Sequence, residues 1–151
     1  MNRWIAATDG SCLGNPGEAG WAWALTRNPE TLEVTASDSG ALGIATNNVA
    51  ELTALLELLK AVPAEQPLEV RMDSQYALNA ASKWRHGWKR RGWKKADGKP
   101  VLNQELIMEI DEHLEGRDIQ YVWVKAHQVG GDVLNDHVDR AARAAATAGI
   151  L

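Results

Sequence analysis

Residues 3–27, RWIAATDGSCLGNPGEAGWAWALTR, decide the fold class because they hold two apolar runs around a glycine-rich stretch. Residues 3–9 are mostly apolar on both faces and predict a central strand. Residues 10–20 contain four glycines and a proline, and they predict a turn. Residues 20–27 alternate small and large side chains and predict a second strand, and a third is expected at about 32–41. The chain is therefore predicted to begin as an antiparallel meander.

The hydrophobic period changes from strand-like to helix-like after this meander. Leucines at helical spacing predict a helix at about 48–61, which Pro63 closes. The remaining predicted elements are a strand at 68–73, helices at 75–82 and 103–115, a strand at 119–127 and a helix at about 136–147. A meander followed by alternating elements predicts an α/β fold in which helices cover a mixed sheet.

Length and composition limit the classes of protein to consider. The 151 residues are expected to form a single domain, 1–151. No apolar run approaches the roughly 18 residues of a transmembrane helix, so no membrane partner is expected. Cys12 is the only cysteine, which excludes an internal disulfide and a cysteine-based zinc site. No secretory signal pattern is present at the N-terminus, and we expect a cytoplasmic protein.

The net charge of −4 hides a strong asymmetry. Residues 83–99, KWRHGWKRRGWKKADGK, carry eight basic residues and one acidic residue, a charge of +7 that leaves −11 for the rest. A basic patch on an acidic body indicates a polyanionic partner. The basic residues alternate in sequence with three tryptophans, Trp84, Trp88 and Trp93. Aromatic side chains among lysines and arginines are typical of a groove that binds a nucleic-acid backbone. The alternative is a solvated charged loop that its tryptophans anchor to the body.

Four carboxylates stand at the predicted ends of different elements. Asp9 and Asp73 end strands, whereas Glu51 and Asp139 lie in the first turns of helices. Each acid also has a structural interpretation as a turn or helix-cap residue: Asp9 before Gly10, Glu51 in a capping box with Asn48, Asp73 as a cap of the next helix, and Asp139 behind a cap at Asp136. Spacing along the chain leaves open whether the four acids converge.

Convergence of the four acids would constrain the chemistry. Clustered carboxylates raise one another's pKa unless a cation neutralises them. Oxygen ligands without a cysteine or a histidine pair favour Mg²⁺ or Mn²⁺ over zinc. Two such ions about 3.5–4 Å apart stabilise the entering and leaving oxygens of an in-line phosphoryl displacement. Motifs of serine hydrolases, P-loop proteins and zinc proteases are absent from the sequence.

Six motifs occur together in the order and spacing of type 1 ribonuclease H, and the chain resembles that family over essentially its whole length. The motifs are TDGSCLGNPG at 8–17, TNNVAEL at 46–52, MDSQYA at 72–77, WKRRGWK at 88–94, VKAH at 124–127 and NDHVDRAARAAA at 135–146. The resemblance implies a ribonuclease H-like fold, with a five-stranded mixed sheet in the order 3-2-1-4-5 and helices on both faces. It implies an endonuclease that hydrolyses the RNA strand of RNA–DNA hybrids and leaves 5′-phosphate and 3′-hydroxyl ends, with little sequence specificity.

The resemblance also implies the residues that carry the chemistry. Asp9, Glu51, Asp73 and Asp139 resemble the ligands of two Mg²⁺ ions, for which Mn²⁺ can substitute. Asp9 would bridge both ions, Asp139 would help hold the ion that activates water, and the other two would hold the ion on the leaving-group side. His127 resembles the mobile-loop histidine that assists proton transfer or product release.

Substrate contacts follow from the same motifs. Cys12, Asn15, Asn47 and Gln75 resemble residues near the minor groove, and Thr46 resembles part of a pocket for a DNA phosphate. Residues 83–99 resemble a basic handle that grips the DNA strand through Trp84, Trp88, Lys89, Arg90, Arg91, Trp93 and Lys94. The implied partner is the RNA–DNA hybrid, bound by a monomer without an obligatory protein partner.

Two departures from the family pattern concern the histidine. Ala126 replaces a frequent glycine, and the stretch from His127 to Asp139 is longer than in close bacterial relatives. Both departures affect the expected reach of His127. The alternatives are a nuclease of the same fold that acts on DNA, such as an integrase or resolvase, a non-catalytic hybrid-binding module, and a structural domain whose acids only cap helices.

Overall fold

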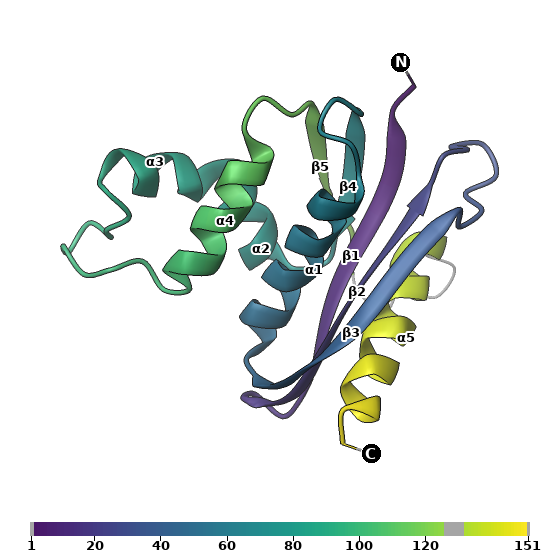
Figure 1. Cartoon of the computed structure of the whole chain (residues 1–151), viewed down its shortest axis with the longest axis horizontal. Coiled ribbons are helices and arrows are strands. Elements are labelled where there is room, and N and C mark those ends of the chain that lie inside the picture. Colours follow the sequence, from purple (N-terminus) through teal and green to yellow (C-terminus); the bar gives the residue numbers. More distant parts are fainter. Residues whose placement is uncertain (1, 126–131, 151) are drawn as a thin grey trace.

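A five-stranded mixed sheet forms the centre of the molecule in the computed structural model, which describes residues 2–125 and 132–150 (Figure 1). Its strands are β1 (Trp4–Leu13), β2 (Gly17–Thr26), β3 (Ala36–Ala45), β4 (Leu68–Met72) and β5 (Ile119–Trp123). The spatial order is β3-β2-β1-β4-β5; β1–β2 and β2–β3 are antiparallel, and β1–β4 and β4–β5 are parallel. The sheet expected from the resemblance is therefore confirmed.

Helices cover both faces of this sheet. They are α1 (Asn47–Ala61), α2 (Gln75–Asn79), the π-helical segment η1 (Ala80–Trp84), α3 (Arg85–Arg90), α4 (Gln104–Leu114) and α5 (Val133–Ala148). Side chains of β1 alternate between the faces: Ala6 packs with the leucines of α1, and Ala7 packs with Val138 of α5. The helix α1 lies between the sheet and α4, which explains why Leu55 and Leu58 are fully buried. No helix within the described ranges is long and apolar enough to cross a membrane.

Two glycines let the helices approach the sheet closely, one on each face. A Cβ atom on Gly10 would lie 2.5 Å from the backbone of α1 at Ala50 and Glu51. A Cβ atom on Gly20 would lie 2.5 Å from the carbonyl oxygen of Ala142 in α5. Real Cβ atoms do not approach backbone so closely, so these positions require glycine. The approach at Gly10 brings α1 to β1, the strand that carries Asp9, and the approach at Gly20 brings α5 to the neighbouring strand β2.

The predicted turn at 10–20 is wrong because most of these residues are in strands. The strand β1 continues to Leu13 and β2 begins at Gly17, which leaves a turn of three residues. Gly10 and Gly20 serve helix–sheet packing, whereas Gly14, whose φ is +91°, lies in the turn itself. The third strand, expected at about 32–41, lies at Ala36–Ala45.

Helix starts also differ from the prediction. Thr46 is the N-cap of α1, and its hydroxyl oxygen accepts a hydrogen bond from the Val49 N–H at 3.2 Å, so the capping box of Asn48 with Glu51 is wrong. Asp132 rather than Asp136 is the N-cap of α5. The helix predicted at 75–82 extends through η1 into α3, so the basic segment 83–99 begins as a helix.

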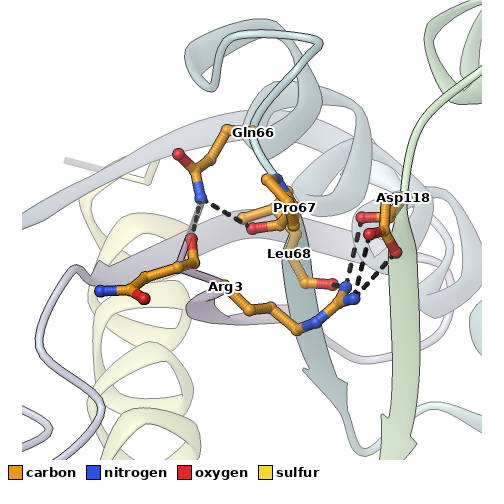
Figure 2. Close-up of polar contacts among 6 residues, drawn as sticks. Arg3, Gln66, Pro67, Leu68 and Asp118 are labelled. Atoms are coloured by element: carbon orange, nitrogen blue, oxygen red, sulfur yellow. Dashed lines mark hydrogen bonds and ion pairs between the residues drawn. The ribbon is translucent and has the colours of Figure 1, made fainter.

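The start of the central strand β1 is held by the Arg3 guanidinium. This group donates to Asp118 Oδ1 at 2.9 Å and to the carbonyl oxygen of Leu68 at 3.0 Å (Figure 2).

The outer strand β3 contains a bulge. The pairing of β2 with β3 shifts register next to Gly20, and Leu42 forms a bulge there before Gly43, whose φ is +72°.

Candidate active site

Three carboxylates converge at the end of β4. One oxygen from each of Asp9, Glu51 and Asp73 can be chosen so that all three lie within 4.8 Å of one another. The parallel pairing explains part of this cluster, because Thr8 pairs with Met72 and the next residue of each strand is an acid. Glu51 reaches the same point from α1 because Gly10 permits the close approach of that helix.

The structural interpretations of these three acids are wrong. Asp9 lies inside β1, opposite Ala22, and accepts a hydrogen bond from the Gly10 N–H at 2.9 Å. Glu51 lies in the second turn of α1, beyond the cap. Ser74 is the N-cap of α2, so Asp73 is not needed in that role. Helix capping and turn formation therefore do not explain this cluster.

Burial and mutual repulsion make the cluster favour a cation. Asp9 is 3% exposed, and burial together with the charges of Glu51 and Asp73 raises its pKa to about 11. Burial, followed by the charge of Asp73, raises the pKa of Glu51 to about 8. Glu51 Oε2 is buried and has no hydrogen-bond partner among the described residues. A divalent cation that prefers oxygen ligands fits this donor set, because it supplies the missing partner and neutralises the repulsion.

Asp139 lies beside the cluster. It projects from the second turn of α5, not from the first as predicted, and lines the same pocket of about 460 Å³ as the other three acids. Its Oδ2 is 3.4 Å from Nη2 of Arg143, one helical turn further along α5. All four predicted acids thus face one pocket, with Asp139 outside the tight group of three.

Arg143 is a pocket residue that the sequence interpretation missed. It lines the pocket together with the four acids, where it adds a positive charge to a negative site. Its spacing of four residues from Asp139 on a predicted helix was a signal that could have identified it.

Comparison with known proteins identifies the family. A family model described as RNase H matches residues 1–147.

The chain belongs to the ribonuclease H family.

The similarity to individual members is high along the whole chain. The chain is 56% identical to ribonuclease HI of Streptomyces coelicolor over 147 residues, which cover 95% of this chain and 62% of that protein. It is 51% identical to ribonuclease H of Tropheryma whipplei strain Twist, over 96% of this chain and 85% of that protein. This chain thus spans about three fifths of the Streptomyces protein.

Solved structures support the same fold. The solution structure of the PFV RNase H domain is similar with a TM-score of 0.82 and 27% identity, covering 98% of each chain. LC11-RNase H1, solved in complex with an RNA/DNA hybrid, is similar with a TM-score of 0.73 and 24% identity, covering 99% of this chain and 100% of that chain. At 24% identity, the second similarity shows the fold alone.

Two of the four residues that the ribonuclease H resemblance assigns to the minor groove line the pocket. Cys12 and Asn47 line it, and the Asn15 side-chain oxygen accepts a hydrogen bond from the Asn47 N–H at 3.1 Å. Thr46 is exposed at the start of α1, and Gln75 is exposed at the start of α2. The Asn15–Asn47 hydrogen bond joins the β1–β2 turn to α1. His127 lies outside the described residues.

The handle combines exposed and anchored aromatic residues. Trp84 is 41% exposed, and its ring centroid lies 5.8 Å from that of Trp88, so these two tryptophans share one side of the helix as predicted. Trp88 and Trp93 are half-buried and pack against the core, as the anchored-loop alternative expected. The handle, with α3 and the loop that follows it, projects from the body of the molecule (Figure 1).

Two cations of the handle are already paired with acids in α4 or directly after it. Asp111 is 3% exposed and accepts from Arg85 at 2.6 Å and from Lys89 at 2.9 Å. Lys89 also contacts Glu115 at 2.7 Å. Arg90 and Lys94 differ from Lys89 in this respect. Both are exposed, and neither has an acidic partner in the described part of the chain. The handle cations are therefore not equivalent.

Proposed function

We propose that this chain hydrolyses the RNA strand of RNA–DNA hybrids as an endonuclease, leaving 5′-phosphate and 3′-hydroxyl ends. The observation that carries the proposal is the convergence of Asp9, Glu51 and Asp73 on a pocket that Asp139 also lines, in a chain of the ribonuclease H family. The Streptomyces and Tropheryma relatives are named ribonuclease HI and ribonuclease H. The proposal extends this activity to the chain as a single catalytic domain.

Two Mg²⁺ ions, replaceable by Mn²⁺, are the proposed cofactors. When bound with substrate, they supply Lewis-acid stabilisation of the attacking and leaving oxygens of the phosphodiester. Asp9, whose carboxylate neighbours two other acids, would hold both ions. Glu51 and Asp73 would hold the ion on the leaving-group side, and Asp139 would hold the ion next to the attacking water. His127 would assist proton transfer or product release.

Selection of the hybrid would depend on sugar and backbone contacts. Cys12, Asn15, Asn47 and Gln75 are proposed to lie along the minor groove, where backbone and amide groups recognise 2′-hydroxyls. Thr46 would bind a DNA phosphate, and the handle would hold the DNA strand. Because none of these contacts reads base edges, little sequence preference is expected. We propose that the chain acts in the cytoplasm as a monomer without an obligatory protein partner.

A cleavage assay on three duplexes of one sequence tests this function. With Mg²⁺, the RNA strand of the hybrid should be cut, and double-stranded RNA and double-stranded DNA should remain intact. Asp9→Asn, which preserves side-chain shape, should abolish turnover and serve as the control for contaminating nucleases. Cleavage of double-stranded DNA instead would favour the integrase or resolvase alternative. Hybrid binding without cleavage by the wild-type chain would favour the binding module.

A further inference from the structure

One guanidinium joins the strand of Asp73 to the helix of Asp139. Arg71 lies on β4, where Val70 and Met72 are fully buried in the core that contains α1. Its side chain therefore lies on the opposite face of the sheet, the face that α5 covers. There, Arg71 Nη1 donates to Asp132 Oδ2, and Arg71 Nε donates to Glu69 Oε2 at 2.7 Å.

Asp132 has two roles at the start of α5. It is the N-cap residue, and its Oδ1 accepts a hydrogen bond from the Asn135 N–H at 2.8 Å. Its second oxygen, Oδ2, accepts from Arg71, and both side chains are largely buried, with 19% and 13% of their surface exposed. The body of α5 packs on β1, β2 and β3. The ion pair adds an attachment to β4 at the end of α5 where the helix begins.

Each partner of this ion pair lies on the same element as an acid of the pocket, or next to it in sequence. Asp73 follows Arg71 by two residues, and Asp139 follows Asp132 by two turns of α5. A rigid helix transmits a shift of its first turn to a side chain about 10 Å further along. The pair therefore constrains the separation between the Asp73 and Asp139 carboxylates.

We propose that Arg71 and Asp132 are positioning residues for the nuclease, and that their ion pair sets where Asp139 stands relative to the Asp9, Glu51 and Asp73 cluster. This inference rests on the proposed function. Neither residue is among the described residues that line the pocket. Their effect is on the orientation of α5, and misplacement of a reacting group by about 1 Å costs up to roughly 100-fold in rate.

The test uses variants that separate this pair from the other roles of each residue. Asp132→Asn keeps a good N-cap residue and removes the charge. Arg71→Gln removes the guanidinium, and Arg71→Lys keeps its charge. Glu69→Gln is the matched control, because it breaks the other ion pair of Arg71 and leaves Asp132 untouched. The kcat and the KM for hybrid are measured under multiple turnover over a range of hybrid concentrations with Mg²⁺, well below the melting temperature of each variant.

The expected result is a loss in kcat with little change in the KM for hybrid. Arg71→Gln and Asp132→Asn should each lower kcat by about 10- to 100-fold. The double variant should lose no more than the worse single variant, because both changes remove one interaction. Arg71→Lys should recover most of the rate, and Glu69→Gln should match wild type. In the metal-free protein, the Asn135 amide should exchange its hydrogen faster in both pair variants, but not in the control.

Three outcomes of the rate measurements, and one of the hydrogen-exchange measurement, would overturn the proposal. The rate outcomes are wild-type kcat in folded Arg71→Gln and Asp132→Asn, losses that multiply in the double variant, and an equal loss in Glu69→Gln. A wild-type chain that cleaves no hybrid would instead overturn the proposed function. Unaltered exchange of the Asn135 amide would show that the pair does not hold the start of α5.

Discussion

Asp9 and Glu51 are residues whose ionisation opposes folding. Their pKa values in the folded chain, about 11 and about 8, lie above the usual values near 4. The folded state therefore binds protons more tightly than the unfolded state. These two carboxyl groups contribute their full stabilisation only at pH values below their pKa in the unfolded chain. Without a cation, this contribution is lost progressively as the pH rises from about 4, through about 8 for Glu51 and through about 11 for Asp9.

Asp9→Asn should therefore stabilise the metal-free protein, and more so at high pH. In EDTA, the melting temperature of the variant should exceed that of wild type by more at pH 8 than at pH 5, because the amide cannot ionise. Each kcal/mol corresponds to about 2–4 °C for a chain of this size. Thermal unfolding followed by circular dichroism gives the comparison. A gain that is equal at both pH values would contradict the raised pKa values.

At the residue scale, the sequence identified the four acids but not their geometry. Asp9, Glu51, Asp73 and Asp139 are separated by tens of residues, so their convergence depends on strand pairing and on helix–sheet approach. The resemblance predicted that convergence, whereas spacing alone did not. The ion pair of Arg71 with Asp132 was not predicted, because a salt bridge between elements far apart in sequence has no periodic signal. Arg143 was missed although its spacing of four residues from Asp139 on a helix is such a signal.

At the scale of elements, glycines control how closely helices and strands approach. Gly10→Ala should push α1 away from β1, because the added Cβ atom would meet the backbone of Ala50 and Glu51. Overpacking of this kind costs about 1–3 kcal/mol, and it should also move Glu51 away from Asp9 and reduce cleavage. Urea unfolding and the hybrid assay measure the two effects. In Gly87→Ala, the control within α3, the nearest atom to the new Cβ is 3.5 Å away, and stability should stay equal or rise.

Element types were predicted well, and element boundaries were not. The order of strands and helices and the buried leucine face of α1 follow from hydrophobic period. The end of β1 and the start of β2 were misplaced because glycine favours turns in general. Here Gly10 and Gly20 lie within strands, where they permit close packing of helices. The π-helical segment η1 was missed because its different hydrogen-bond pattern leaves no trace in residue type.

The handle is an element whose cations should differ in their contribution to hybrid binding. Arg90→Ala should lower the slope of log K against log salt by about 0.9 if Arg90 contacts one phosphate, with the duplex DNA value as a guide. Lys89→Ala should lower it less, because Asp111 and Glu115 already pair with Lys89. Hybrid affinity at three salt concentrations, with Ca²⁺ in place of Mg²⁺, measures both slopes. Equal slopes for the two variants would show that the ion pairs of Lys89 open in the complex.

At the scale of the whole molecule, cation binding and folding are coupled. A ligand that binds only the folded chain stabilises it by about 2.7 kcal/mol at 100 times its Kd. Mg²⁺ or Mn²⁺ should therefore raise the melting temperature of wild type, and EDTA should reverse the rise and abolish cleavage. Asp9→Asn should show little response to either ion, because it removes the carboxylate that neighbours both other acids of the cluster. An equal rise in the variant would place the cation elsewhere.

The bulge at Leu42 has a consequence for encounters between molecules. An outer strand offers a row of unpaired N–H and C=O groups, on which a strand from another molecule can be added. In β3 the bulge breaks that row, and Asp38 is exposed on the same strand. The other outer strand, β5, has only five residues. Both borders of the sheet therefore resist strand addition, and with it the growth of amyloid-like aggregates at high concentration.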